Sequence, residues 1–298
     1  MNPIDAILKP LSPAWALKRA QARQMLAFYE ASKPTRTRRN KSDNSSGNTL
    51  TDSAAETLRG QARHLEQNHD LARGVLTCLV NNVVGPKGIS VEFQPKNSDG
   101  SINKDLAAEL NWYFTEWGRN PETTGEYSWA KAQRMVARAW FRDGEVVSKS
   151  LQGRVPLLNH RTLVPYSLEL LEADHIADLD DPGRNIIQGI ERNAWGTPRF
   201  IYLYDQHPGD ASGFRLRYRR TAAEEVDHLK MTDRIRQNRG VSIFAAVMNR
   251  LNDLKDYEEA ERVAARISAA MAAYIKKGAP EMYGMAGEDG EDEDRTFE

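Results

Sequence analysis

Apolar residues recur every three or four positions in several stretches of the chain, which is the spacing of amphipathic helices. Ser53 and Glu56 stand three apart, as in a capping box, and predict that the first helix opens there. Gly85-Pro86 ends this helix. Its apolar positions are Leu71, Val75, Leu76, Leu79, Val80 and Val83. The same spacing predicts two more helices, over 103–118 and 129–144.

Alternation of apolar and polar residues predicts strands elsewhere. Residues 89–95 alternate in this way, and short strand-like runs follow Gly144. The segment "IIQGIERNAWGTPRFIYLYD" is typical of a hairpin that turns at Trp195-Gly196. In "FRLRYRR" the arginines share one face, which is either a solvated face of a half-buried strand or a surface for phosphates or a neighbouring subunit. Helices and short antiparallel strands together indicate the α+β class.

The longest helical pattern runs without proline, and with no glycine before its end, from Ser242 to Lys277. At about 1.5 Å per residue it would span roughly 54 Å. A pattern of more than about 25 residues without internal caps is typical of a bundle or an oligomer wall. Its apolar positions are therefore candidates for a subunit interface. They are Phe244, Val247, Leu251, Leu254, Val263, Ile267 and Met271.

The composition indicates a globular protein with a sizeable core, since 40% of the 298 residues are hydrophobic and 28% are charged. The formal net charge is −1, so no overall field favours nucleic acid or a membrane. Residues 1–50 nevertheless hold nine basic and three acidic side chains, and residues 281–298 hold one basic and eight acidic. We interpret the first stretch as a flexible arm, either solvated or touching nucleic acid or an acidic partner through Arg36, Arg38 and Arg39.

Motifs that bind phosphates, dinucleotides or catalytic zinc do not occur in the sequence. Cys78 is expected to be a buried small hydrophobe, and the N-terminus lacks the pattern of a signal peptide. One segment, "LEADHIADLDDPG", has two interpretations: carboxylates at a turn and on the surface, or magnesium ligands of a nuclease. Its carboxylates are Glu172, Asp174, Asp178, Asp180 and Asp181. We favour the turn, and predict no catalytic residue, metal or cofactor.

Several segments, in order, resemble the lambda-type portal proteins of tailed bacteriophages. "NNVVGPKGISV" is similar to the family's helix that ends in a turn and strand, and "WAKAQRMVARAWFRDGEVV" to its helix ending in "DGE". "LELLEADHI" resembles a strand of the family, and "GIERNAWGTPRFIYLYDQHPGD" resembles its hairpin. "RIRQNRGVS", followed by "LNDLKDYEEAE", resembles its most distinctive stretch. Together these segments cover about residues 60–275.

The resemblance implies a structural protein without enzymatic activity that forms a ring at one capsid vertex, through which DNA enters and leaves. The implied partners are copies of itself in a ring that is dodecameric when full length, terminase, major capsid and scaffold proteins, head-completion and tail connector proteins, and double-stranded DNA. The implied location is the virion, and the host cytoplasm during assembly, with no membrane involved. Two alternatives are a phage DNA-binding protein that uses the basic arm and a metal-dependent nuclease.

By the same resemblance, the chain divides into the basic arm (1–50), an α/β wing-like domain (51–235), a stem-type helix (236–277) and an acidic loop or tail at the start of a truncated clip region (278–298). In the ring, each stem-type helix would pack against the same helix of the next subunit. The charged residues on its remaining face would line the channel or pair between subunits. They are Asp253, Lys255, Glu258 and Arg262.

Overall fold

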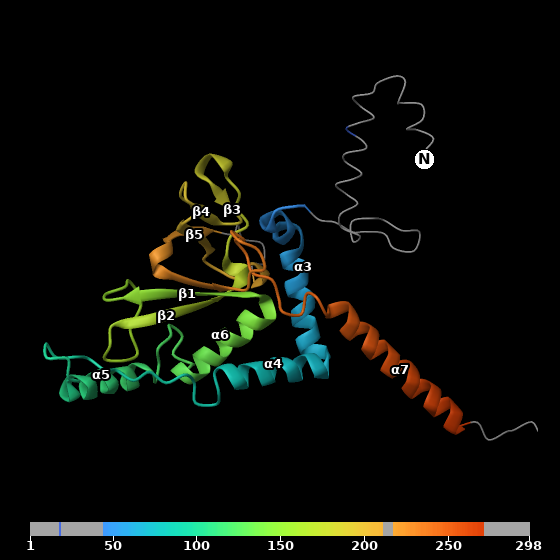
Figure 1. Ribbon diagram of the computed structural model, residues 1–298, viewed down its shortest axis with the longest axis horizontal. Coiled ribbons are helices and arrows are strands. Elements are labelled where there is room, and N and C mark those ends of the chain that lie inside the picture. The colour runs from blue at the N-terminus through green and yellow to red at the C-terminus, as the bar shows by residue number, and fades with distance from the viewer. Residues whose placement is uncertain (1–17, 19–43, 211–216, 271–298) are drawn as a thin grey trace, which may run out of the picture.

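This computed structural model describes Lys18, residues 44–210 and residues 217–270, which contain five α-helices and two antiparallel sheets (Figure 1). The helices are α3 (Gly47–Asn68), α4 (Asp70–Val83), α5 (Lys104–Trp117), α6 (Trp129–Asp143) and α7 (Met248–Ala270). The strands are β1 (Glu145–Gln152), β2 (Tyr166–Glu172), β3 (Ile186–Ile187), β4 (Ile190–Arg192), β5 (Pro198–Tyr204), β6 (Tyr218–Ala222) and β7 (Val226–Lys230). The predicted α+β class is confirmed.

The two sheets share one apolar cluster. β1 is the central strand of the first sheet, between β2 and β7, and the second sheet has the order β3-β4-β5-β6. Val147 of β1 and Val226 of β7 are buried in the same cluster as Leu203 of β5. The β4–β5 pair is the hairpin that the sequence predicts, and Thr197 closes its turn by donating its N–H to the Asn193 side chain over 2.9 Å.

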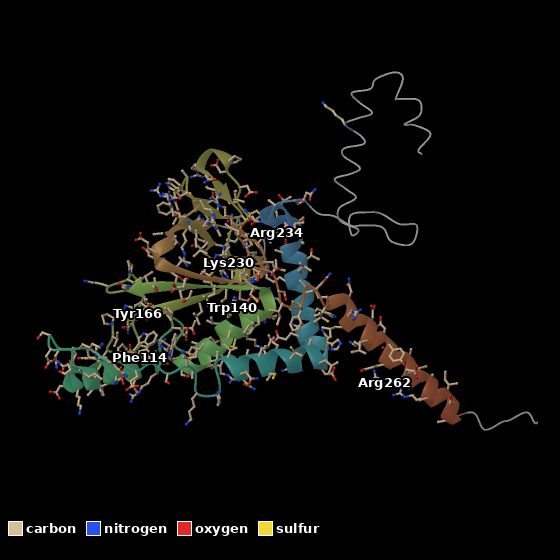
Figure 2. The ribbon with its side chains drawn as sticks, in the orientation of Figure 1. Phe114, Trp140, Tyr166, Lys230, Arg234 and Arg262 are labelled. Atoms are coloured by element: carbon tan, nitrogen blue, oxygen red, sulfur yellow. The ribbon has the colours of Figure 1, made fainter. Side chains whose placement is uncertain are left out.

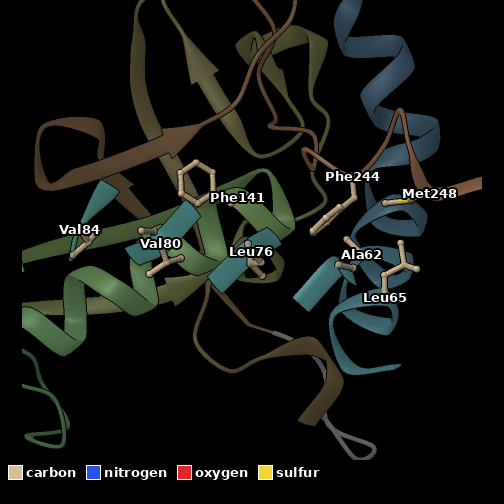
Figure 3. Close-up of a cluster of buried hydrophobic side chains, with 10 residues drawn as sticks. Ala62, Leu65, Leu76, Val80, Val84, Phe141, Phe244 and Met248 are labelled. Atoms are coloured by element: carbon tan, nitrogen blue, oxygen red, sulfur yellow. The ribbon is translucent and has the colours of Figure 1, made fainter. Parts of the chain in front are cut away.

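A second apolar core lies between α3, α4 and α6 and includes the segment that leads into α7 (Figure 3). Figure 3 shows Phe244 and Met248 beside Leu65 of α3, with Leu76, Val80 and Phe141 of the other two helices in the same cluster. Phe244 and Met248 are both only 3% exposed. The root of α7 is therefore fastened to the body of its own chain.

The first helix begins earlier than Ser53, so the predicted capping box is wrong. Ser46 is the N-cap, and its hydroxyl accepts a hydrogen bond from the N–H of Thr49 over 3.2 Å. Ser53 lies inside the helix, where its hydroxyl donates to the carbonyl of Leu50 over 3.1 Å. The predicted helix is also divided in two, because His69 takes an extended backbone conformation between α3 and α4.

Helix α4 is apolar on two faces, and only one of them is buried. Ala72, Leu76 and Val80 face the core, whereas Leu71 and Val75 are 47% and 51% exposed. Cys78 follows Leu76 by two residues, which is about 200° around a helix, and so it is exposed. The expectation that Cys78 is buried is therefore wrong.

Residues 89–95, expected to form a strand, form no sheet. Side chains of the neighbouring helices bind their backbone instead: Ile89 donates its N–H to Gln133 Oε1 over 2.6 Å, and its carbonyl accepts from Gln133 Nε2 over 3.2 Å. Phe93 donates its N–H to Asn111 Oδ1 over 3.4 Å. An alternating pattern needs a partner strand to become a ladder, and none lies beside this segment in the described part of the chain.

Helix α7 begins at Met248, six residues later than the pattern predicts, because Ile243 to Val247 form turns that place Phe244 in the core. From there the helix projects away from the body (Figure 1). After Met248 only Leu251 is half-buried, and the remaining residues to Ala270 are exposed. None of the described helices is long and apolar enough to cross a membrane.

Candidate functional site

The point where α7 leaves the body is built from segments far apart in the sequence. Two glycines lie against each other there, one after α6 and one before α7. A Cβ on Gly240 would lie 2.1 Å from the carbonyl oxygen of Gly144, and a Cβ on Gly144 would lie 2.2 Å from the carbonyl carbon of Val241. Neither position has room for a side chain. We call residues 143–145 and 234–240, with the side chains that bind them, the junction.

A fully buried carboxylate lies at the centre of the junction. Glu145 is 0% exposed and accepts hydrogen bonds from Arg239 Nε at 2.7 Å, the N–H of Gly240 at 2.9 Å and His228 Nε2 at 3.0 Å. Arg59 of α3 adds an ion pair at 3.4 Å. Burial alone would raise the pKa of Glu145, but the charges of Arg239 and His228 and their hydrogen bonds hold it well below its usual range. The carboxylate is therefore a charged and fully partnered link between β1, β7, α3 and the segment before α7.

The amide side chains of the junction hold its backbone in place. Gln237 Oε1 accepts from the N–H groups of Asp233 and Arg234, both at 3.2 Å. Asn238 Nδ2 donates to the carbonyl of Ile187 over 3.0 Å, which ties the segment to the second sheet. The ammonium of Lys230 donates to the Gln237 and Asn238 carbonyls at 2.7 and 3.0 Å. Figure 2 shows Lys230 near the middle of the body and Arg234 beside the N-terminal end of α3.

Burial also changes the acidity of Lys230. Loss of solvent, followed by repulsion from Arg192, lowers the pKa of Lys230 to about 8 from 10.5. The charged ammonium is thus less favourable here than in water, although two carbonyls bind it. The junction consequently contains a pH-dependent contribution to stability in the mildly alkaline range.

Four of the five carboxylates suggested as magnesium ligands are bound by arginines or by turn backbone; the exception is Asp178. Glu172 Oε2, Asp174 Oδ2 and a ring nitrogen of His207 lie within 4.8 Å of one another, the one such group of three among the described residues. Arg63 Nη2 already lies 2.5 Å from Asp174 and 3.1 Å from Glu172. Burial would raise the pKa of Asp174, but Arg59 and Arg63 lower it. A guanidinium therefore occupies the place between these carboxylates that a cation would take.

The rest of the acidic segment forms a turn, as favoured from the sequence. Asp181 Oδ1 accepts from the N–H of Gly183 over 3.0 Å, and its other oxygen binds Arg184 Nε at 2.8 Å. Asp180 Oδ1 accepts from the N–H of Gln188 over 2.6 Å. These contacts use carboxylates to close a loop, and within the acidic segment they leave Asp178 as the carboxylate without a partner among the described residues.

The residues singled out as interface candidates are not brought together on one surface. Phe244 is buried in its own core, so the structure gives it an intramolecular place, and Leu251 packs against the same core. Val247, Leu254, Val263 and Ile267 are 42%, 40%, 45% and 54% exposed. The charged candidates on α7 are all exposed. They are Asp253, Lys255, Glu258 and Arg262, of which Arg262 is labelled in Figure 2. Four candidates lie outside the described residues, namely Arg36, Arg38, Arg39 and Met271.

Sequence reasoning did not identify Glu145, His228, Lys230 or Arg59 as one cluster. The available signal was the pair of short segments "DGE" and "RG", each with a glycine beside a charged residue. Their contact is long-range, with Glu145 and Arg239 separated by 94 positions in the chain. A single sequence does not show which of its distant segments meet.

Comparison with known proteins finds similarity over most of the chain. The family model for phage portal proteins of the lambda family matches residues 33–297. The chain is also similar to a probable portal protein of Halomonas phage phiHAP-1, with 27% identity over 254 residues. The alignment covers 80% of this chain and 47% of that protein, so the chain spans about half the length of this relative.

Proposed function

This chain belongs to the lambda family of phage portal proteins, and on that premise we propose that it contributes the wall of a ring-shaped channel at a capsid vertex. Family membership identifies a structural protein of the phage. The more specific role is supported by one observation above all: α7 projects from the body with its apolar side chains uncovered. A helix in this position requires contacts from outside the subunit.

The apolar residues of α7 wind around the helix. At about 100° per residue, Val263 and Ile267 lie roughly 180° and 220° from Leu254. Tyr257, 63% exposed, lies on the side of Leu254. The helix is therefore apolar on one side near Leu254 and Tyr257. Farther along its axis, near Val263 and Ile267, it is apolar on the nearly opposite side. A subunit in a closed ring needs two different surfaces, one for each neighbour, because its contacts are head-to-tail.

The free energy gained by burying these side chains at a subunit contact is large enough to favour assembly. Full burial of a Leu, Ile or Val side chain contributes about 1.5–3 kcal/mol. Leu254, Val263 and Ile267 are about half exposed, so each has on the order of 1 kcal/mol left to gain. Repeated at every subunit contact of a ring, this gain favours closure. We propose that the Leu254 side of one helix packs on the Val263–Ile267 side of the next.

The charges of α7 suit the passage of DNA. The helix carries five acidic and four basic side chains, so it is close to neutral. A strongly basic wall would bind phosphates and retain the duplex, since affinity for DNA increases with each phosphate that is neutralised. We propose that Asp253, Lys255, Glu258 and Arg262 face the channel or pair between subunits.

The proposed partners follow from this role. They are copies of the chain, terminase during packaging, the major capsid and scaffold proteins, the head-completion and tail connector proteins, and the DNA itself. The proposed location is the virion, with assembly in the host cytoplasm. We propose no catalytic activity, because Arg63 binds both carboxylates of the one group of three possible metal ligands among the described residues, Glu172, Asp174 and His207.

The test is the mass of the assembled particle. Leu254→Asp and Ile267→Asp, each made alone, should lower the ring population measured by mass photometry at least tenfold, because each places a charge in one of the two proposed contacts. Asn252→Asp is the matched control, since it adds the same charge to an exposed position of the same helix. Leu251 is unsuitable for this purpose because it packs on its own core. Rings formed equally by all three variants would contradict the assignment of α7.

A further inference from the structure

A turn within the junction presents side chains that the body leaves uncovered. Residues 234–237 form a β-turn, closed by a backbone hydrogen bond of 3.3 Å. Ile235 at its tip is 96% exposed, and Trp195 in the adjacent hairpin turn is 86% exposed. The guanidinium of Arg236 lies 3.8 Å from where a Cβ on Gly196 would be, so the two turns touch. We call this surface the knob, and it consists of Trp195, Arg234, Ile235 and Arg236.

The backbone of the knob is strained. Arg236 has a φ of 65°, in the left-handed region, at a turn position where glycine or asparagine is favoured. Residues with long side chains rarely adopt this conformation, and where they do, the strain often accompanies a function. Glycine would relieve the strain. The arginine side chain is therefore present despite its backbone cost.

The positive charge of the knob is not balanced locally. No described residue forms a hydrogen bond or an ion pair with the Arg236 guanidinium. Burial, and then the charge of Arg236, lower the pKa of nearby Arg192, whose partners are an amide and a carbonyl oxygen. Arg234 binds the carbonyl of Ser45. Asp233 is the neighbouring carboxylate in the chain. Its single negative charge leaves the three positive charges of Arg192, Arg234 and Arg236 in excess.

An acidic pocket of about 470 Å³ lies elsewhere on the same chain. Its lining includes five carboxylates and two arginines, together with the apolar surfaces of Ile176, Tyr204 and Pro208. Both arginines are already paired, Arg59 with Asp174 and Glu145 and Arg239 with Glu145. Asp52 and Glu56 on α3 and Asp178 have side chains without a partner among the described residues. The pocket thus has the charge and the apolar surface that complement an isoleucine flanked by arginines.

The hollow beside the knob and the acidic pocket lie on different sides of α3 and meet at Thr51 and Ala55, which line both. Leu50, Ala54 and Leu58 line a hollow together with Arg234, whereas Asp52, Glu56 and Arg59 line the acidic pocket. At about 100° per residue, these two sets lie roughly 170° apart around the helix. Ile235 is 96% exposed, so the knob does not occupy the pocket of its own chain, and that pocket is open to the knob of a neighbouring copy. A head-to-tail contact between two different surfaces is the kind that closes into a ring.

We propose that the knob of one subunit docks into the acidic pocket of the next, as a second ring contact on the body besides the α7 contact. This rests on the proposed ring. The partner is a protein surface because phosphate groups would pair with the arginines but leave Ile235 in water. Trp and Arg are also the residue types most enriched at the energetic centres of protein interfaces.

Disulfide trapping tests the contact directly in the full chain. In a Cys78→Ser background, Ile235→Cys is combined with Asp178→Cys, and the oxidised protein is analysed on a non-reducing gel. We expect a ladder of cross-linked subunits. The matched control replaces Ile235→Cys by Leu157→Cys, which is at least as exposed at 108% and should give at least fivefold less cross-linking. Equal cross-linking of the test and control proteins would overturn the proposal and leave the proposed ring intact. The same holds if no cross-links form in protein whose measured mass shows rings. Absence of any association would contradict both.

Arg236→Gly separates docking from folding. Because glycine relieves the strained φ, the thermal midpoint should stay equal or rise by about 2–4 °C in a domain of this size. Ring formation should nevertheless fall at least fivefold, and Arg236→Glu should be rescued by Glu56→Arg. Unchanged assembly with Arg236→Gly would refute the contact. If Arg236→Glu instead weakens binding to duplex DNA and leaves assembly unchanged, the knob binds nucleic acid and the proposal is wrong.

Discussion

Replacing Glu145 with glutamine shows how much the buried charge of the junction contributes to stability. The carboxylate is fully buried and is bound by Arg239 at 2.7 Å and His228 at 3.0 Å. Glutamine keeps the shape but leaves Arg239, 8% exposed, without its counter-charge. Removing one partner of a buried ion pair typically costs about 3–5 kcal/mol. The retained amide oxygen still accepts hydrogen bonds, so we expect a loss near the lower end, about 3 kcal/mol.

The assay is chemical unfolding of both proteins at pH 7, followed by circular dichroism. The matched control is Glu169→Gln, which removes the partner of Arg219 from a more exposed pair and should cost less than about 1 kcal/mol. An equal loss of unfolding free energy in the two variants would refute the argument that burial makes Glu145 special.

The effect of Glu145 should also depend on pH. Its pKa is lowered on folding from 4.5, the value for the unfolded chain. A carboxyl whose pKa is lowered on folding contributes stability that is fully present above the unfolded value and is lost as the pH falls toward the folded value. The difference between wild type and Glu145→Gln should therefore be constant from pH 7 to about 5 and shrink below pH 4.5. A difference that grows toward low pH would contradict the sign of the shift.

Two further substitutions test other parts of the junction. Gly240→Ala should cost about 3 kcal/mol in unfolding free energy, the upper end of the usual range for overpacking, since its Cβ would lie 2.1 Å from the Gly144 carbonyl oxygen. Gly60→Ala, with nothing within 4 Å, should be neutral or stabilising. Wild type should gain stability relative to Lys230→Met as the pH rises from 8 to 10.5, because the unfolded chain then binds more protons than the folded one. Unfolding curves measured at both pH values check this, and a constant difference would contradict it.

The elements that the sequence predicts well are those with local signals. The hairpin at Trp195-Gly196 and the helix over Lys104–Trp117 need only a turn and a periodic pattern, and both are present. The error at Cys78 has a physical reason, since α4 has apolar residues on two faces and periodicity does not show which face meets the core. The expected strand over 89–95 failed because its partner is a set of side chains and not another strand.

The junction could not be predicted because its contacts are long-range. Gly144 and Gly240 each read as ordinary turn glycines until the fold places their backbones together. The same limit applies to α7: its pattern continues from Ser242 in the sequence, but Phe244 is drawn into the core and delays the helix to Met248. The spacing alone therefore overestimated how many apolar residues of this pattern are exposed and able to contact a neighbouring subunit.

The most direct test of the central claim is an electron cryomicroscopy reconstruction of the assembled chain. We predict closed rings in which α7 of each subunit lies at the inner wall, with the Leu254 side of one helix against the Val263–Ile267 side of the next. Rings in which α7 lies on the outer surface, or particles in which α7 folds back on its own body and makes no contact with a neighbour, would contradict the claim that this helix forms the channel wall.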